Sequence, residues 1–95
     1  MTKELILDYL TTHKTFLQEQ FNVKKIGLFG SYAKEQQTPQ SDIDIIVDMP
    51  SSFDNYYALK ELLEKELGEK VDLGLEKSIR KLIKEKISHE VLYID

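Results

Sequence analysis

The apolar residues of the chain follow two kinds of pattern, and each pattern predicts a different kind of secondary structure. Residues 2–21 carry apolar side chains at spacings of three and four, which predicts one amphipathic helix with Thr2 as its cap and Asn22 at its end. His13 lies on or beside this stripe, and we expect it to be a partly buried packing residue, because no second histidine, cysteine or carboxylate is spaced to join it as a ligand. The stripe consists of Leu5, Ile6, Tyr9, Leu10, Phe16 and Leu17.

Shorter apolar runs predict strands, because they are too short for helices and are bounded by polar or turn-forming residues. We place strands over 24–29, from Asp42 to about Asp48, over Val71–Leu75 and over 91–94. Helices separate some of these strands, so the order of elements predicts an α/β (α+β) fold in which helices pack on a small mixed sheet.

Two longer helices are expected in the second half of the chain. Ser51 or Ser52 caps a helix over Phe53–Leu67, and Gly68 occupies the position that usually ends one. Ser78 caps a last helix whose inward side carries Ile79, Leu82, Ile83 and Ile87. Its outer side is basic, which is typical of a solvated face, although it could also dock an acidic group of a partner. These basic residues are Lys77, Arg80, Lys81, Lys84 and Lys86.

Length and composition narrow the class of protein. Ninety-five residues are enough for a single domain, which we place over 1–95. No cysteine is present, so disulfides, thiolate metal sites and a cysteine nucleophile are excluded. The N-terminus has no long apolar segment typical of a signal peptide and no run is long enough to span a bilayer, so we expect a cytoplasmic protein without a membrane partner.

The net charge of −4 disfavours direct, stable binding to nucleic acid, because release of counterions from phosphates requires a basic surface. An acidic chain is better suited to a basic protein partner, or to cations that in turn bring in phosphates.

Three aspartates carry the clearest chemical signal. Asp42 and Asp44 are one residue apart at the mouth of the second strand, so they share one face of the strand, while Ile43, Ile45 and Val47 point to the core. A third carboxylate, Asp72, lies on the outward face of the third strand. Clustered carboxylates repel one another unless a cation lies between them, and hard oxygen ligands suit Mg²⁺ or Mn²⁺. Two such ions can clamp the attacking and leaving oxygens of a phosphoryl transfer.

The connection between the first two strands is suited to a phosphate. Gly30 permits a close approach of another group, and Ser31 is placed to cap a short helix that runs to about Lys34. Backbone amides at a helix start and a serine hydroxyl can hold the β- and γ-phosphates of a nucleotide. An ordinary strand-to-helix turn would explain Gly30 and Ser31 equally well by themselves. A polar loop with a Thr38-Pro39 turn then leads to Asp42.

At these residues the chain resembles the polymerase-beta-type nucleotidyltransferase superfamily, and more closely its small members called minimal nucleotidyltransferases. Their signature is Gly-Ser, ten residues and Asp-x-Asp, which here is Gly30-Ser31, Tyr32 to Ser41, and Asp42-Ile43-Asp44. The resemblance extends over nearly the whole chain, including the Val71-Asp72-Leu73 strand and the closing Glu90 to Tyr93 segment.

The resemblance implies a polymerase-beta-like nucleotidyltransferase core and the antitoxin of a pair with a HEPN-domain toxin. It implies that Asp42, Asp44 and Asp72 bind two Mg²⁺ ions, with Mn²⁺ possible, and form the catalytic site, and that Gly30 and Ser31 hold the nucleoside triphosphate. In that family the antitoxin can transfer AMP from ATP to a tyrosine hydroxyl of the toxin and so silence it, and the resemblance implies the same activity for this chain.

Two residues depart from the family pattern. Lys34 stands where an arginine is common, and Glu35 where a glycine is common, so phosphate contacts and loop shape are the features that these differences affect.

Two other functions stay open at this point. The chain could neutralise a toxin by covering it without catalysis, or it could transfer nucleotides to a small molecule or an RNA end. The retained set of three carboxylates argues against the first. Against the second, the chain has no residues left for a domain that grips the acceptor, and it is acidic.

Overall fold

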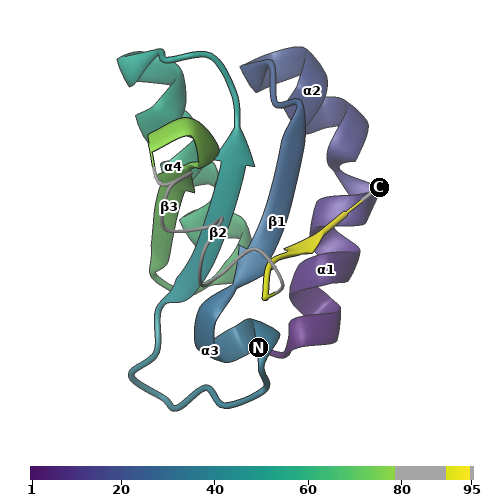
Figure 1. Ribbon diagram of the computed structural model, residues 1–95, viewed down its shortest axis with the longest axis vertical. Coiled ribbons are helices and arrows are strands. Elements are labelled where there is room, and N and C mark those ends of the chain that lie inside the picture. The colour runs from purple at the N-terminus through teal and green to yellow at the C-terminus, as the bar shows by residue number, and fades with distance from the viewer. Residues whose placement is uncertain (79–89, 95) are drawn as a thin grey trace.

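The computed structural model describes residues 1–78 and 90–94 (Figure 1). In chain order its elements are α1 (Lys3–Thr12), α2 (Lys14–Phe21), β1 (Lys25–Phe29), α3 (Gly30–Ala33), β2 (Ile43–Asp48), α4 (Phe53–Leu67), β3 (Val71–Leu75) and β4 (Leu92–Tyr93).

The strands form one mixed sheet in the order β3-β2-β1-β4. β1 runs antiparallel to β2 and to β4, whereas β2 and β3 are parallel and are joined by the crossover helix α4. The mixed sheet packed by helices confirms the predicted fold class. The short helix α3 lies at the end of the sheet where β1 finishes and β2 starts (Figure 1).

The helices cover one face of the sheet, which we call the helix face. Alternate residues of β2, namely Ile43, Ile45 and Val47, are fully buried there. Val71 and Leu73 of β3 extend the same core. From the helices the core receives Ile6 and Leu10 of α1, Leu17 of α2, and Leu59, Leu63 and Leu67 of α4.

The leading segment contains two helices and not the single one predicted over 2–21. α1 ends at Thr12, and the backbone of His13 leaves the helical region before α2 begins. The Thr11 hydroxyl donates to the Leu7 carbonyl at 2.8 Å, a competing bond that bends helices, and threonine is itself a weak helix former. His13 is half-buried, as predicted, with its ring stacked on Tyr9 at 4.1 Å between ring centroids.

Most of the predicted helix ends are confirmed. Thr2 accepts a hydrogen bond from the Leu5 N–H at 3.2 Å, and Asn22 ends α2 in the left-handed conformation. Ser52, not Ser51, caps α4 by accepting from the Asn55 N–H.

The strands lie where the pattern placed them, to within one residue at each end. The predicted last helix already includes Glu76 and Lys77, so Ser78 lies within it and is not its cap. Residues 79–89, which carry the rest of the prediction and His89, lie outside the described part of the chain. In the described residues, no helix combines the length and the apolar character needed to cross a bilayer.

Candidate active site

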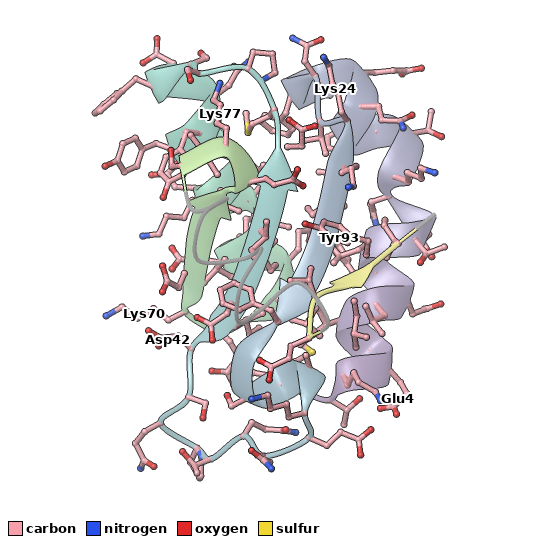
Figure 2. All side chains as sticks on the ribbon, in the orientation of Figure 1. Glu4, Lys24, Asp42, Lys70, Lys77 and Tyr93 are labelled. Carbon is pink, nitrogen blue, oxygen red and sulfur yellow. The ribbon has the colours of Figure 1, made fainter. Side chains whose placement is uncertain are left out.

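Asp44 and Asp72 face each other across two neighbouring parallel strands. β2 and β3 pair with Asp44 directly opposite Asp72, and paired strands lie about 4.8 Å apart. Asp42 comes two residues before Asp44, just ahead of β2, and is exposed at the end of the sheet (Figure 2). The tertiary structure therefore brings the three predicted aspartates to one end of one sheet face, which we call the carboxylate face.

The loop before Asp42 is a closed turn that fixes where β2 begins. The Ser41 N–H donates to the Thr38 carbonyl at 3.0 Å, with Pro39 at the second position of the turn. The Ser41 hydroxyl accepts from the Thr38 N–H at 2.9 Å. Ile43 then joins the sheet by donating its N–H to the Lys70 carbonyl at 2.8 Å. The predicted Thr-Pro turn is confirmed, and it delivers Asp42 to the edge of the site.

Gly30 lies against the carboxylate of Asp44. Its φ of +77° is in the region that favours glycine, and a Cβ atom built on it would overlap an oxygen of Asp44. Phe29, the preceding residue, pairs with Asp44 across β1 and β2. The Gly-Ser corner and the metal-binding candidates thus belong to one site, because only a residue without a side chain lets the turn come this close.

Ser31 does not cap α3, contrary to the prediction. The helix already begins at Gly30, whose carbonyl accepts from the Lys34 N–H at 3.2 Å, and Phe29 occupies the cap position without a side-chain bond. The positive φ of Gly30 turns the chain one residue earlier than the sequence pattern suggested. Ser31 is consequently part of the helix, and its hydroxyl is not used as the cap.

The end of α3 is held by two ion pairs. Glu35 adopts a φ of +58°, a conformation that glycine reaches more easily, and its carboxylate pairs with Lys3 at 2.9 Å. Lys34 pairs with Glu90 at 3.2 Å, which ties the helix to the segment that enters β4. Both residues that depart from the family pattern therefore form ion pairs on the surface of this chain.

The carboxylates perturb one another. Burial, together with the charges of Asp72 and Asp42 and a hydrogen bond with Asp72, raises the pKa of Asp44 to about 6. None of the ion pairs found in the described residues includes Asp42, Asp44 or Asp72. The charge of this cluster is therefore not balanced by a neighbouring lysine or arginine in that part of the chain.

This donor set is suited to a hard divalent cation, since carboxylate oxygens are the ligands that Mg²⁺ and Mn²⁺ prefer. Within residues 1–78 and 90–94, however, no three acidic, histidine or cysteine side chains are grouped so that they could hold an ion by themselves. Mg²⁺ commonly uses one or two carboxylates and completes its shell with water and phosphate oxygens. The arrangement fits an ion that arrives with a nucleotide better than a permanently bound one.

The far end of the carboxylate face is closed by an unpredicted network. Tyr93 of β4 donates its hydroxyl to Glu76 at 3.0 Å, and Lys25 lies 4.4 Å from the Tyr93 ring centroid and 3.8 Å from Glu76. Burial and the Glu76 contact raise the pKa of Tyr93 to about 12. Gly27 allows this crossing, because a Cβ there would come within 2.9 Å of Tyr93. Glu76 belonged to no sequence motif, and Tyr93 entered only as part of the closing Glu90 to Tyr93 segment, with no role predicted for its hydroxyl.

The fold and this constellation define a nucleotidyltransferase: a Gly-Ser corner against paired aspartates on a mixed sheet. The model of the nucleotidyltransferase domain family matches residues 10–94, and the chain belongs to that family.

Relatives of similar length carry related names. A Methanocaldococcus jannaschii protein, provisionally named a protein adenylyltransferase, is 45% identical over 94 residues, which cover 94% of each chain. The protein adenylyltransferase MntA of Thermococcus cleftensis is 40% identical over 96 residues, which cover 99% of this chain and 97% of the relative.

Solved structures share the fold. A toxin–antitoxin complex with AMP-PNP matches with a TM-score of 0.69 and 25% identity over 84% of this chain and 67% of that one. A complex of a tri-AMPylated Shewanella oneidensis HEPN toxin with an MNT antitoxin matches with a TM-score of 0.66 and 21% identity, over 97% of this chain and 71% of that one.

Proposed function

We propose that this nucleotidyltransferase is the antitoxin of a toxin–antitoxin pair, and that it transfers AMP from ATP to a tyrosine hydroxyl of a HEPN-type toxin in a metal-dependent reaction. The observation that carries the proposal is the register of β2 and β3, which sets Asp44 opposite Asp72 with Gly30 directly against Asp44. The names of the relatives support a protein as the acceptor, and the solved complex with a tri-AMPylated toxin supports a HEPN partner.

Each predicted site residue has a role in this proposal. Gly30 lets the turn lie directly against the Asp44 carboxylate, and the Ser31 hydroxyl, which caps no helix, would donate a hydrogen bond to a phosphate oxygen. Asp42, Asp44 and Asp72 would hold two Mg²⁺ ions together with oxygens of the nucleotide. When bound, such ions neutralise the charge of the triphosphate and acidify the attacking hydroxyl.

The proposed reaction is an in-line displacement. The tyrosine oxygen forms a bond to the α-phosphorus while the bond from that phosphorus to the bridging oxygen breaks, so pyrophosphate leaves with the electron pair. The tyrosine proton passes to the carboxylate of Asp72, which is exposed on the outer strand β3. The toxin tyrosine carries AMP after the transfer.

The test is incubation of the purified chain with the product of the neighbouring gene, ATP and Mg²⁺, followed by intact-mass measurement of both proteins. We expect the partner to gain one or more AMP units and the gain to disappear with EDTA. Asp44→Asn is expected to lower the transfer rate by at least about a thousandfold, because it removes charge at the reacting centre.

Two controls separate catalysis from binding. Circular dichroism checks that Asp44→Asn is folded, and size-exclusion chromatography checks that it still binds the partner. A stable complex without any mass gain for the wild type would contradict the proposed transfer and identify an antitoxin that acts by binding alone. A mass gain that persists in Asp44→Asn would contradict the proposed site.

A further inference from the structure

Asp72 is carried by the outermost strand of the sheet. β3 pairs with β2 alone in the described residues, and the Ile43 N–H donates to Lys70 on that side. In a parallel ladder the backbone groups of alternate residues point to opposite sides, so those of Lys70 and Asp72 face β2 while those of Val71 and Leu73 face the free edge. Edge strands of this kind are the parts of a sheet that open most easily.

Two side chains of α4 bind that free edge on either side of Asp72. The Glu64 carboxylate accepts from the Val71 N–H at 3.0 Å. The Tyr56 hydroxyl donates to the Leu73 carbonyl. Both residues are partly buried, and they lie two turns apart on α4, so they hold the residue before and the residue after Asp72.

We infer that Glu64 and Tyr56 are positioning residues for the transfer reaction, acting through the backbone of β3 on the carboxylate of Asp72. This inference rests on the proposed function, in which Asp72 accepts the tyrosine proton. The ladder with β2 fixes Asp72 from one side, and on the other side, within residues 1–78 and 90–94, the two α4 side chains take the place of a strand.

The physical reason is that a proton transfer tolerates little displacement of the group that accepts the proton. A misplacement of about 1 Å can lower a rate by about a hundredfold, and a strand held by hydrogen bonds along one edge only has more freedom to shift than one held along both. A carboxylate acceptor makes a stronger hydrogen bond to a backbone N–H than a neutral group does. Glu64 and Tyr56 therefore restrict the movement of β3 at the two residues next to Asp72.

The experiment measures kcat and the KM for ATP with the complete chain, its partner toxin and Mg²⁺. Glu64→Met removes the acceptor at similar length, and Tyr56→Phe removes only the hydroxyl. We expect each variant to lower kcat about tenfold while the KM for ATP is unchanged, because the Gly30 side of the site is intact. Glu64→Gln keeps a side-chain oxygen that can accept the Val71 N–H, and it should restore kcat to within about twofold of wild type.

Ser52→Ala is the matched control for stability. It removes the hydroxyl that caps the N-terminal end of α4, so it destabilises the same helix while leaving both side-chain bonds to β3 in place. The inference predicts a normal kcat for this variant. Equal losses of kcat in Ser52→Ala, Glu64→Met and Tyr56→Phe would overturn it and leave only a structural role for these residues.

Failure of the inference and failure of the proposed function are distinguishable through Asp72→Asn. An inactive Asp72→Asn beside fully active Glu64→Met and Tyr56→Phe would overturn the positioning role alone. A fully active Asp72→Asn would overturn the proposed role of Asp72 as proton acceptor, and the positioning role with it.

Discussion

The two faces of the sheet are built from the same strands, but one face forms the apolar core and the other carries the cluster of carboxylates. On the helix face, Ile43, Ile45 and Val47 are completely buried among apolar residues of three helices. On the carboxylate face, Asp44 shares its space with Asp42 and Asp72, and its pKa is raised to about 6. The first arrangement lowers the free energy of the fold, whereas the second raises it. A single strand can thus hold a destabilising charge cluster because its alternate residues stabilise the fold.

Among variants that keep all three aspartates, the largest expected effect tests the close approach of Gly30 to Asp44 on the carboxylate face. Gly30→Ala should lower the transfer rate at least about a hundredfold, because the new Cβ would displace the Asp44 carboxylate. The measurement is the rate of AMP transfer under saturating ATP.

Gly68→Ala provides the matched control for Gly30→Ala. Gly68 has a φ of +71°, close to that of Gly30, but nothing lies within 4 Å of a Cβ added there. It should cost roughly 1–2 kcal/mol of stability from backbone strain and leave the rate of the folded enzyme unchanged. Similar transfer rates for Gly30→Ala and wild type would show that catalysis on the carboxylate face does not need the close approach of Gly30 to Asp44.

The next largest effect concerns the helix face. Leu63→Ala removes a fully buried side chain of α4 and should lower the free energy of unfolding by about 2–5 kcal/mol, as measured by urea denaturation. Glu61→Ala, at an exposed position of the same helix, is the control and should change stability by less than about 0.5 kcal/mol. At temperatures where both variants are folded, their transfer rates should equal that of wild type. A lower transfer rate for Leu63→Ala under those conditions would contradict the view that the helix face contributes to stability and the carboxylate face to catalysis.

The smallest effect is the pH dependence of stability in the absence of metal. Asp44 binds its proton more tightly in the folded state, with a pKa of about 6, than in the unfolded state, so the contribution of Asp44 to stability is highest below about pH 4. It should fall as the pH rises from about 4 to about 6 and then stay constant. Asp44→Asn removes this dependence and should be more stable than wild type by about 1 kcal/mol at pH 7.5, a value reduced for solvent screening of a half-buried group.

Thermal unfolding with EDTA at pH 4 and pH 7.5 measures that difference. Equal stability gains from Asp44→Asn at both pH values would argue against a charge cluster. Adding Mg²⁺ with a non-hydrolysable ATP analogue should stabilise the wild type at pH 7.5 and have a smaller effect on Asp44→Asn, because ligands that bind only the folded state raise its stability.

Residue spacing alone determined the strands, the α4 helix and the side of the strand on which Asp42 and Asp44 lie. These features follow from local periodicity and from short-range caps such as Thr2 and Ser52, which depend on neighbours within a few residues. The nucleotidyltransferase family was also accessible from the sequence, because the Gly30-Ser31 and Asp42-x-Asp44 motifs are local and ordered.

Only the tertiary structure decided which groups meet across the sheet. The register that sets Asp44 opposite Asp72 depends on a crossover through α4, and no local spacing records it. The break at His13, the early start of α3 at Gly30 and the Tyr93–Glu76 bond were likewise missed. The break at His13 accompanies a local bond from the Thr11 hydroxyl to the Leu7 carbonyl, which apolar spacing does not reveal. The turn of Gly30 against Asp44 and the Tyr93–Glu76 bond instead need partners from distant parts of the chain, so they are fixed only when both partners are in place.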